Sequence, residues 1–306
     1  MRKTHGRRTL AWILAMAAFL CAAAAPAEDI QYVENTLNYV DGSMDVSDGI
    51  PDDAVGVLAR IREKGVLRIA TDADFAPQEF VDPALEGQDQ YAGADMELAR
   101  LIAERMNVQL EIVKMDFTDV LSAVAEGECD LAISALAYTP ARASAYTMSK
   151  GYYFSDVPKT VVVVRTEDAE TIRSVADLKD KTLIAQQGSL QETMVADNVF
   201  QYKEFRRVPE ISTVYSSVTR GNADAGALDA ETAMEYLEQN PECGLVIAGG
   251  IEFLLEEDYQ GDRIAARKGE AMLMYFINGV IDEVLDEDLY EKWMDEARER
   301  AAELGL

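Results

Sequence analysis

The chain has 306 residues, with 28 Lys or Arg against 56 Asp or Glu, which gives a formal net charge of −28. Nucleic acids and anionic membranes bind basic patches, so this balance argues against both as partners. The only histidine is His5, which lies in a leader segment. Once that leader is removed, no histidine is left for a Ser-His-Asp or Cys-His mechanism or for a His-ligated metal site. We therefore expect no metal and no cofactor.

Residues 1–27 have the plan of a secretory signal peptide. Four basic residues lie near the start, an apolar run extends from residue 10 to residue 25, and small residues at 25–27 suit cleavage. The apolar run is short for a membrane span. A lipoprotein anchor at Cys21 is the alternative, but Leu20 stands where lipid-modification sites need a small residue. We predict cleavage after residue 27 and a soluble protein in the periplasm.

The next segment, residues 28–52, is acidic, poor in aliphatic residues and interrupted by glycine and proline. This composition predicts an extended arm or linker, to which we assign no function. From residue 53 the pattern changes to a helix, with apolar side chains at Val57, Leu58 and Ile61, and Gly65 ends it.

Strands and helices alternate from residue 66 onward. The expected strands of a first set are 66–71, 109–113 and 130–135, and those of a second set are 160–165, 182–185, 203–208, 224–228 and 244–248. A last part holds a strand at 263–268 and helices at 271–285 and 289–303. This alternation predicts an α/β fold with mostly parallel sheets, in which ligands bind beyond the carboxyl ends of the strands.

Two segments of the chain are similar to each other. SAVAEGECDLAISA (122–135) and SSVTRGNADAGALD (216–229) align without gaps, and both consist of a helix, a glycine, two residues, an aspartate and an apolar strand. A chance match is one explanation, because any strand–helix–strand unit can enter its strand this way. The alternative is two similar lobes around a shared cleft, with Ala135 and Asp229 on opposing walls.

A single arginine stands out in the segment that follows the strand 130–135. Thr139 and Pro140 have the pattern of an N-cap followed by proline at the first helical position, which places Arg142 in the first turn of a short helix. An arginine beside strand ends is suited to gripping an anion together with backbone N–H groups. A solvated surface arginine is the alternative.

Four segments resemble, in collinear order, the family 3 extracellular solute-binding proteins, the polar amino-acid receptors of ABC importers. They are ATDADFAPQEF, GADMELARLIAERM, DLAISALAYTPAR…SKGYY and NADAGALDAE. The resemblance implies a two-lobed periplasmic-binding-protein-like fold of type II with two hinge crossovers. It places one lobe at 53–153 with a return at 251–306, and the other at 154–250. It also implies a monomer that captures a free amino acid and docks on a membrane permease.

The resemblance assigns roles to both charged ends of the ligand. It gives the α-carboxylate to Arg142 and the α-ammonium to Asp229, although an N-cap role for Asp229 is compatible with this. Unpaired buried charges are too costly to leave, so both partners are needed. Ser134, Ala135 and Ala137 are expected to line the wall through backbone groups. The family often has Thr or Ser at the position of Ala137, so one side-chain hydrogen bond is missing here.

The same resemblance covers the ligand's side chain. Phe75 and Phe117 match aromatic residues that sandwich it, although core packing is the commoner role of an isolated phenylalanine. Ser189 opens a helix whose free N–H groups could also meet the carboxylate. Asp72 and Gln186 match positions at the far end of the side chain.

A carboxylate at Asp72 predicts a neutral polar or basic ligand, because it would repel glutamate or aspartate in a desolvated cleft. Glutamine, lysine and arginine are not separated by this argument. The alternative is that Asp72 only caps its own loop and faces solvent.

The main functional hypothesis is thus a periplasmic receptor without enzymatic activity. The rival is a periplasmic enzyme resembling cyclohexadienyl dehydratases on the same fold. The presence of Asp229 favours the receptor, because prephenate has no amino group. A sensory-receptor domain is a third option. Cys129 and Cys243, expected in different lobes, are predicted to be free thiols.

Overall fold

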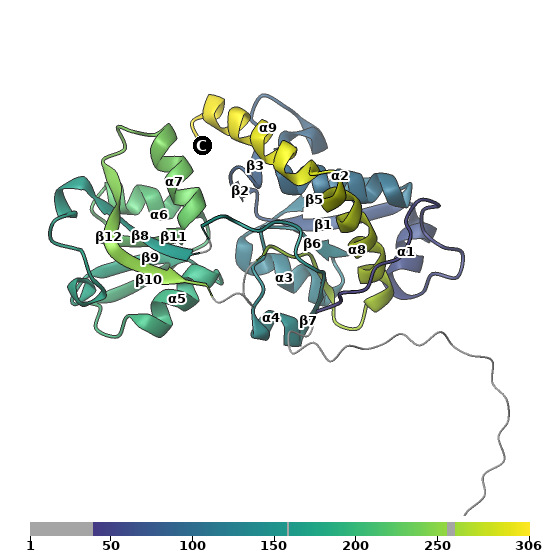
Figure 1. Cartoon of the computed structure of the whole chain (residues 1–306), viewed down its shortest axis with the longest axis horizontal. Helices are drawn as coiled ribbons and strands as arrows, with labels where there is room; N and C mark the ends of the chain where they lie inside the picture. Colours follow the sequence, from purple (N-terminus) through teal and green to yellow (C-terminus); the bar gives the residue numbers. More distant parts are fainter. Residues whose placement is uncertain (1–38, 158, 256–260) are drawn as a thin grey trace, which may run out of the picture. The chain divides into compact units, whose positions relative to one another are not determined.

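The computed structural model describes residues 39–157, 159–255 and 261–306 (Figure 1). The predicted signal peptide and residues 28–38 of the predicted arm lie outside the described residues. Among the residues that are described, no helix is both long enough and apolar enough to cross a membrane.

Two five-stranded sheets organise the chain. The first has the order β5-β1-β6-β13-β7, with β1 (Val66–Thr71), β5 (Gln109–Lys114), β6 (Leu131–Ala132), β7 (Tyr146–Met148) and β13 (Ala265–Arg267). The second has the order β10-β9-β11-β8-β12, with β8 (Lys159–Arg165), β9 (Thr182–Gln186), β10 (Glu204–Val208), β11 (Ala225–Asp229) and β12 (Leu245–Leu254). A small antiparallel sheet contains β2 (Asp74–Phe75), β3 (Glu79–Val81) and β4 (Tyr91–Ala92).

The two large sheets have the same internal plan. Three neighbouring strands are parallel in each, β5-β1-β6 and β10-β9-β11, and the other two run antiparallel to their neighbours. The self-similar segments end in β6 and β11, which hold the same third position. In each sheet four strands point the same way and one, β13 or β8, is reversed, so the sheets are mostly parallel, as predicted, with one antiparallel strand each. The strands that break the parallel order include β8 and β13, with which the chain enters or re-enters a sheet after leaving the other.

Helices cover both sheets. Those of the first sheet are α1 (Gly56–Lys64), α2 (Ala94–Met106), α3 (Phe117–Glu126), α4 (Pro140–Ala145), α8 (Ala271–Asp286) and α9 (Leu289–Leu304). Those of the second are α5 (Leu190–Asn198), α6 (Ile211–Thr219) and α7 (Ala230–Gln239), and short 3-10 turns lie at Gly87–Gln90, Thr166–Asp168 and Val175–Leu178. β12 continues to Leu254, so the second sheet extends four residues past the boundary expected at 250.

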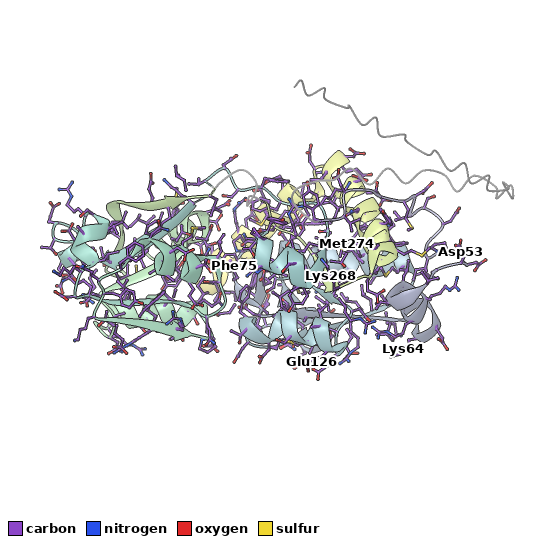
Figure 2. All side chains as sticks on the ribbon, turned by 90° about the horizontal axis from the view of Figure 1, so that it is seen from below. Asp53, Lys64, Phe75, Glu126, Lys268 and Met274 are labelled. Carbon is purple, nitrogen blue, oxygen red and sulfur yellow. The ribbon has the colours of Figure 1, made fainter. Side chains whose placement is uncertain are left out.

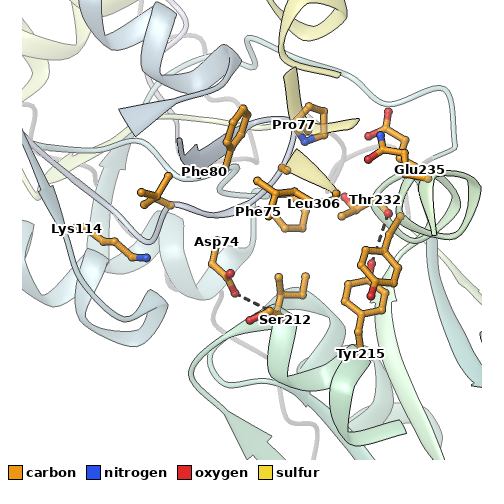
Figure 3. A pocket seen from close by; sticks show the side chains of 18 residues that line it. Asp74, Phe75, Pro77, Phe80, Lys114, Ser212, Tyr215, Thr232, Glu235 and Leu306 are labelled. Atoms are coloured by element: carbon orange, nitrogen blue, oxygen red, sulfur yellow. Dashed lines mark hydrogen bonds between the residues drawn. The ribbon is translucent and has the colours of Figure 1, made fainter. Parts of the chain in front are cut away.

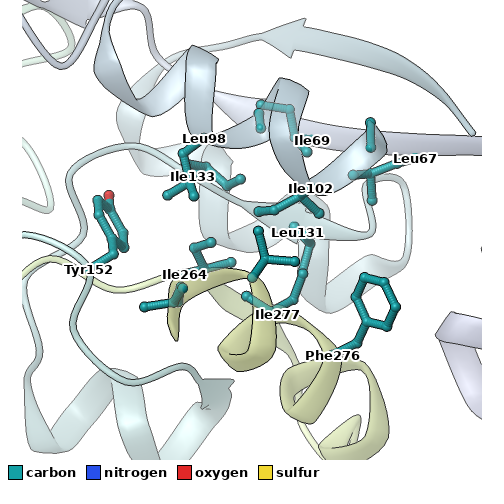
Figure 4. Close-up of a cluster of buried hydrophobic side chains, with 14 of the residues drawn as sticks. Leu67, Ile69, Leu98, Ile102, Leu131, Ile133, Tyr152, Ile264, Phe276 and Ile277 are labelled. Atoms are coloured by element: carbon teal, nitrogen blue, oxygen red, sulfur yellow. The ribbon is translucent and has the colours of Figure 1, made fainter. Parts of the chain in front are cut away.

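The largest core cluster lies between the first sheet and the helices α2 and α8. Its fully buried side chains include Leu67, Ile69, Ile102, Leu131 and Ile277 (Figure 4). Burying one such side chain stabilises the folded state by about 1.5–3 kcal/mol. This cluster therefore holds β1 and β6, and with them the carboxyl ends of both strands, in place. Cys129 lies in a neighbouring cluster behind β6, and both described cysteines, Cys129 and Cys243, are free thiols.

The described part of the predicted arm differs from an extended linker. Val46 is 3% exposed and belongs to the core of the first sheet. Asn278 of α8 donates from Nδ2 to the carbonyl oxygens of Val40 (2.7 Å) and Gly42 (2.9 Å). The segment can pass close to α8 because Gly279 has no side chain, and a Cβ there would come within 2.2 Å of the Met44 carbonyl oxygen. The composition of the segment did not predict this packing, because a few apolar residues are enough to fix it to the core.

Candidate functional site

Two adjoining cavities lie where the carboxyl ends of strands from both sheets meet. We call the first the Arg142 cavity, of about 40 Å³. Nine of the ten predicted ligand-binding residues line it: Asp72, Phe75, Phe117, Ser134, Ala135, Ala137, Arg142, Gln186 and Ser189. The tenth, Asp229, lines a second cavity of about 70 Å³, which we call the Asp229 cavity and which shares Phe75, Ala135 and Ala137 with the first. The structure thus brings all ten together, and their role in ligand binding stays a prediction.

Arg142 is positioned by the start of α4. Thr139 Oγ1 accepts a hydrogen bond from the Arg142 N–H (3.1 Å), and Pro140 occupies the first turn, as the sequence predicts. The side chain is turned inward, and the residue is only 9% exposed. Its guanidinium donates to the carbonyl oxygens of Ala137 (2.7 Å) and Gly188 (3.2 Å), and it lies 5.7 Å from the ring centre of Phe117. Burial lowers the pKa of Arg142 to about 10.

No described carboxylate forms an ion pair with Arg142. Its partners are carbonyl oxygens, which carry no full charge, so a bound anion would be its natural counter-ion. Leu190 and Gln191 line the same cavity, and their N–H groups belong to the first turn of α5, which has no earlier turn to accept them. Ser189 caps α5 by accepting from Glu192 N at 3.0 Å. The site can therefore hold a carboxylate with both a cation and backbone donors.

Two buried carboxylates lie in the Arg142 cavity. Asp72 is 4% exposed and accepts from the N–H of Asp74 (2.8 Å) and from Nε2 of Gln186 (2.6 Å). It therefore caps its own loop, but it lines the cavity and does not face solvent, contrary to the second alternative considered from the sequence. Its contact with a ligand stays a prediction. Glu79 of β3 is 1% exposed, and its Oε1 accepts from Ser134 Oγ (2.7 Å). Its Oε2 is buried with no partner among the described residues.

Burial raises the pKa of both acids. The pKa of Asp72 rises to about 6, and that of Glu79 rises well above its usual range, first through burial and then through the charges of Asp95 and Asp72. Sequence reasoning missed Glu79. The available signal was a glutamate at the start of the short apolar strand β3, paired in register with Phe75.

Asp229 ends β11 and is the N-cap of α7. Its Oδ1 accepts from the N–H of Thr232 (3.1 Å), and burial raises its pKa to about 6. Two acids that the sequence did not single out, Glu231 and Asp262, line the same cavity. Burial also raises the pKa of Asp262 well above its usual value. Gln78 lines the cavity as well, and its Oε1 is buried without a described partner.

The backbone wall is less open than expected. Ala135 N–H donates to Asp95 Oδ2 (2.8 Å), and Ser134 Oγ, which donates to Glu79, also accepts from Asp72 N (3.2 Å). The carbonyl of Ala137 already accepts from Arg142. Ser134 and Ala135 thus each use a polar group in a hydrogen bond within the protein, and the Ala137 carbonyl holds the Arg142 side chain.

Phe75 lines both small cavities and also a larger one of about 370 Å³, which we call the Phe80 cavity (Figure 3). Phe75 and Phe80 line it from the small sheet, and Tyr215 lines it from α6. Asp74 Oδ2 accepts from Ser212 N (3.1 Å) across it. In Figure 2, Phe75 is labelled where side chains of the two sheet-bearing parts meet.

The electrostatic balance of the two small cavities is strongly acidic. Among the described residues that line them, Arg142 is the single cation, against Asp72, Glu79, Asp229, Glu231 and Asp262. No group of three or more His, Cys, Asp or Glu in the described part of the chain is placed to hold a metal ion. The arrangement suits a ligand that has one anionic group and more than one cationic or N–H donor group.

The chain belongs to the bacterial extracellular solute-binding proteins, family 3, whose family model matches residues 67–296. The resemblance noted in the sequence is thereby confirmed, and so is the two-lobed α/β fold. The arginine-binding extracellular protein ArtP of Bacillus subtilis is 29% identical over 239 residues, which cover 75% of this chain and 86% of that protein.

Two further comparisons bear on function. An amino acid ABC transporter substrate-binding protein, AbpA from Streptococcus pneumoniae, was solved bound to L-arginine. It is 30% identical with a TM-score of 0.71, and the match covers 80% of this chain and 99% of that one. A cyclohexadienyl dehydratase of Pseudomonas aeruginosa is 28% identical over 192 residues, which cover 60% of this chain and 67% of that enzyme.

Proposed function

We propose that this protein is an extracellular receptor that binds a basic amino acid, with L-arginine as the leading candidate, and delivers it to an ABC permease. The observation that carries the proposal is the pair of buried carboxylates, Asp72 and Glu79, in the same cavity as the unpaired Arg142. The relative ArtP is named for arginine binding, and the AbpA structure contains arginine, which supports the same choice.

Each group of arginine has a partner of opposite charge in this arrangement. The α-carboxylate is bound by Arg142 and by first-turn N–H groups of α5, and the α-ammonium by Asp229. The guanidinium is bound by Asp72 and Glu79, where it replaces the amide donor of Gln186 on Asp72. The rings of Phe75 and Phe117 flank the planar side chain. Each charged group of the ligand then has a partner, which a desolvated cleft requires.

Binding is completed by closure of the two sheet-bearing parts around the ligand, the usual motion of two-lobed receptors. The proposal includes export through the leader at residues 1–27, a location outside the inner membrane, a monomeric state and lobe boundaries near those expected from the sequence. The closed form is what the permease would recognise.

Competition calorimetry tests the ligand class. Arginine is expected to bind most tightly, lysine and histidine more weakly, glutamine more weakly still, and glutamate not at all. Asp72→Asn is expected to reduce the preference for arginine over glutamine. Glutamate binding in preference to arginine would overturn the proposal, as would an unchanged preference in Asp72→Asn.

An enzyme is the second candidate, because the chain is similar to a cyclohexadienyl dehydratase and because Glu79 is a buried carboxyl group with a raised pKa. Such a group can serve as a general acid. The acidic lining opposes this function, since prephenate is an anion without an amino group. Incubation with prephenate is expected to give no phenylpyruvate, and its formation at enzymatic rates would replace the receptor proposal.

A further inference from the structure

Helix α7, which covers the second sheet, forms ion pairs with α9, which belongs to the helices of the first sheet. α7 packs on β8, β11 and β12, whereas α9 packs on α2 and α8. Arg298 of α9 donates from Nη2 to Glu231 Oε1 (3.1 Å) and from Nε to Glu235 Oε1 (2.6 Å). The two acids are four residues apart on α7, so they lie one turn apart on the same face. One guanidinium thus joins the first two turns of α7 to the C-terminal helix.

A second contact reinforces the first. Tyr153 donates from its hydroxyl group to Glu231 Oε1 (2.6 Å), and its ring lies 5.1 Å from that of Tyr290 on α9. The Tyr290 hydroxyl donates to Asp95 Oδ1 (2.6 Å), and the other oxygen of Asp95 accepts from Ala135 N. The first turn of α7 is therefore connected through packed side chains to the wall of the Arg142 cavity.

We propose that Arg298 is a positioning residue for ligand capture. By clamping α7 to α9, it sets Asp229, the N-cap of α7, opposite Ala135 and Arg142. It does not touch the ligand. The clamp keeps a near-closed arrangement of the two sheet-bearing parts populated without ligand, so less of the binding free energy is spent on closure. This inference rests on the proposed function, because it assumes that the ammonium group is bound at Asp229.

The environment of the clamp makes it stronger than a surface ion pair. The side chains of Arg298, Glu231 and Glu235 are 29%, 18% and 19% exposed. The guanidinium has three carboxylate partners, these two on α7 and Asp295 on α9 itself. Exposed single pairs contribute little, whereas removing one partner of a shielded group leaves charge unpaired. Without Arg298, Glu231 would also face Asp229 and Asp262 uncompensated, and repulsion would push α7 outward.

The same helix supplies a matched control. Arg300 lies two residues further along α9 and likewise pairs with carboxylates, here Asp82 and Glu303. Both partners belong to the first-sheet side, since Glu303 is on α9 itself and Asp82 follows β3. Arg298→Met and Arg300→Met therefore remove the same charge from the same helix, but only the first breaks the link to α7.

The experiment measures the Kd for L-arginine by calorimetry and the radius of gyration by small-angle X-ray scattering, with and without arginine. Arg298→Met is expected to raise the Kd about tenfold and to increase the radius of gyration without arginine, with a return to the wild-type value at saturation. Arg300→Met is expected to change the Kd less than twofold. Long-range electrostatics alone predicts the opposite for Arg298→Met, since losing a cation would tighten the binding of a cationic ligand.

Two further variants keep the test decisive if Arg298→Met does not fold. Glu235→Gln breaks one arm of the clamp with the opposite change of charge, and it is expected to weaken binding and open the protein in the same way. Arg298→Lys keeps the charge with fewer donors and is expected to fall between wild type and Arg298→Met. An unchanged or lower Kd together with an unchanged radius of gyration overturns the inference. If wild type does not bind arginine, the proposed function fails, while the radii without ligand still decide whether the clamp exists.

Discussion

Replacing Glu79 by glutamine is expected to weaken arginine binding while stabilising the protein without ligand. Glu79 is 1% exposed, its Oε1 accepts from Ser134 Oγ, and its Oε2 has no partner within the described residues. Glutamine has nearly the same shape and can accept the same hydrogen bond, so the packing is preserved. Any change in affinity or stability then reports on the charge.

The two free energies move in opposite directions. Burial, with the charges of Asp95 and Asp72, raises the folded-state pKa of Glu79, so ionisation of this group opposes folding. Stability is therefore lost as the pH rises through that pKa, and Glu79→Gln removes this loss. In the proposed complex the carboxylate is a partner of the ligand guanidinium. Losing one hydrogen bond to a charged group costs about 1.5–3 kcal/mol, which is roughly 10- to 150-fold in Kd.

Calorimetry with arginine and with citrulline, its uncharged analogue, separates charge from shape, and urea unfolding at pH 7 gives the free energy of unfolding. Arginine affinity should fall, citrulline affinity should stay, and the free energy of unfolding should rise. The reasoning is refuted if arginine affinity changes less than threefold, or if both ligands lose affinity equally.

Three other outcomes are expected. Arg142→Met should cost about 3–5 kcal/mol of binding free energy, because a buried ligand carboxylate is left unpaired; a calorimetric loss below tenfold would contradict its role. Arginine affinity should be fully present above about pH 7 and fall toward pH 5, because Asp72 and Asp229, with pKa values of about 6, accept the ligand's cationic groups only when ionised. A pH-independent Kd would argue against both. Ile102→Ala, in the main core, should lower the free energy of unfolding, measured in urea, by about 2–5 kcal/mol. The Kd for arginine, measured where the variant is folded, should not change.

Much of the site could be predicted because its residues carry local signals. Arg142 follows a Thr-Pro helix start, and Asp229 ends an apolar strand and begins a helix, so both were placed by neighbours in sequence. Glu79 and Asp262 carry no such signal. Each is a single acid in a short segment, and only tertiary burial distinguishes it from a surface carboxylate.

The fold shows the same division between local and long-range information. Periodicity located the longer strands and helices, but it missed the short strands β2, β3, β4 and β7 and did not show strand direction. β8 and β13 pair antiparallel because of the route by which the chain passes between sheets, which no local pattern records. The segment at 39–52 was expected to be a linker because its packing rests on a few scattered apolar residues and on hydrogen bonds to Asn278, which is more than 200 residues away.

The position of Phe75 has a consequence for engineering this protein. Phe75 lines both the Arg142 cavity of about 40 Å³ and the Phe80 cavity of about 370 Å³, and it is the residue that their linings share. We therefore expect the size of this side chain to affect how long a ligand the site accepts. A leucine or alanine at this position would join the two spaces and open a route to receptors for ligands longer than arginine, with the charged groups that recognise the amino acid left in place.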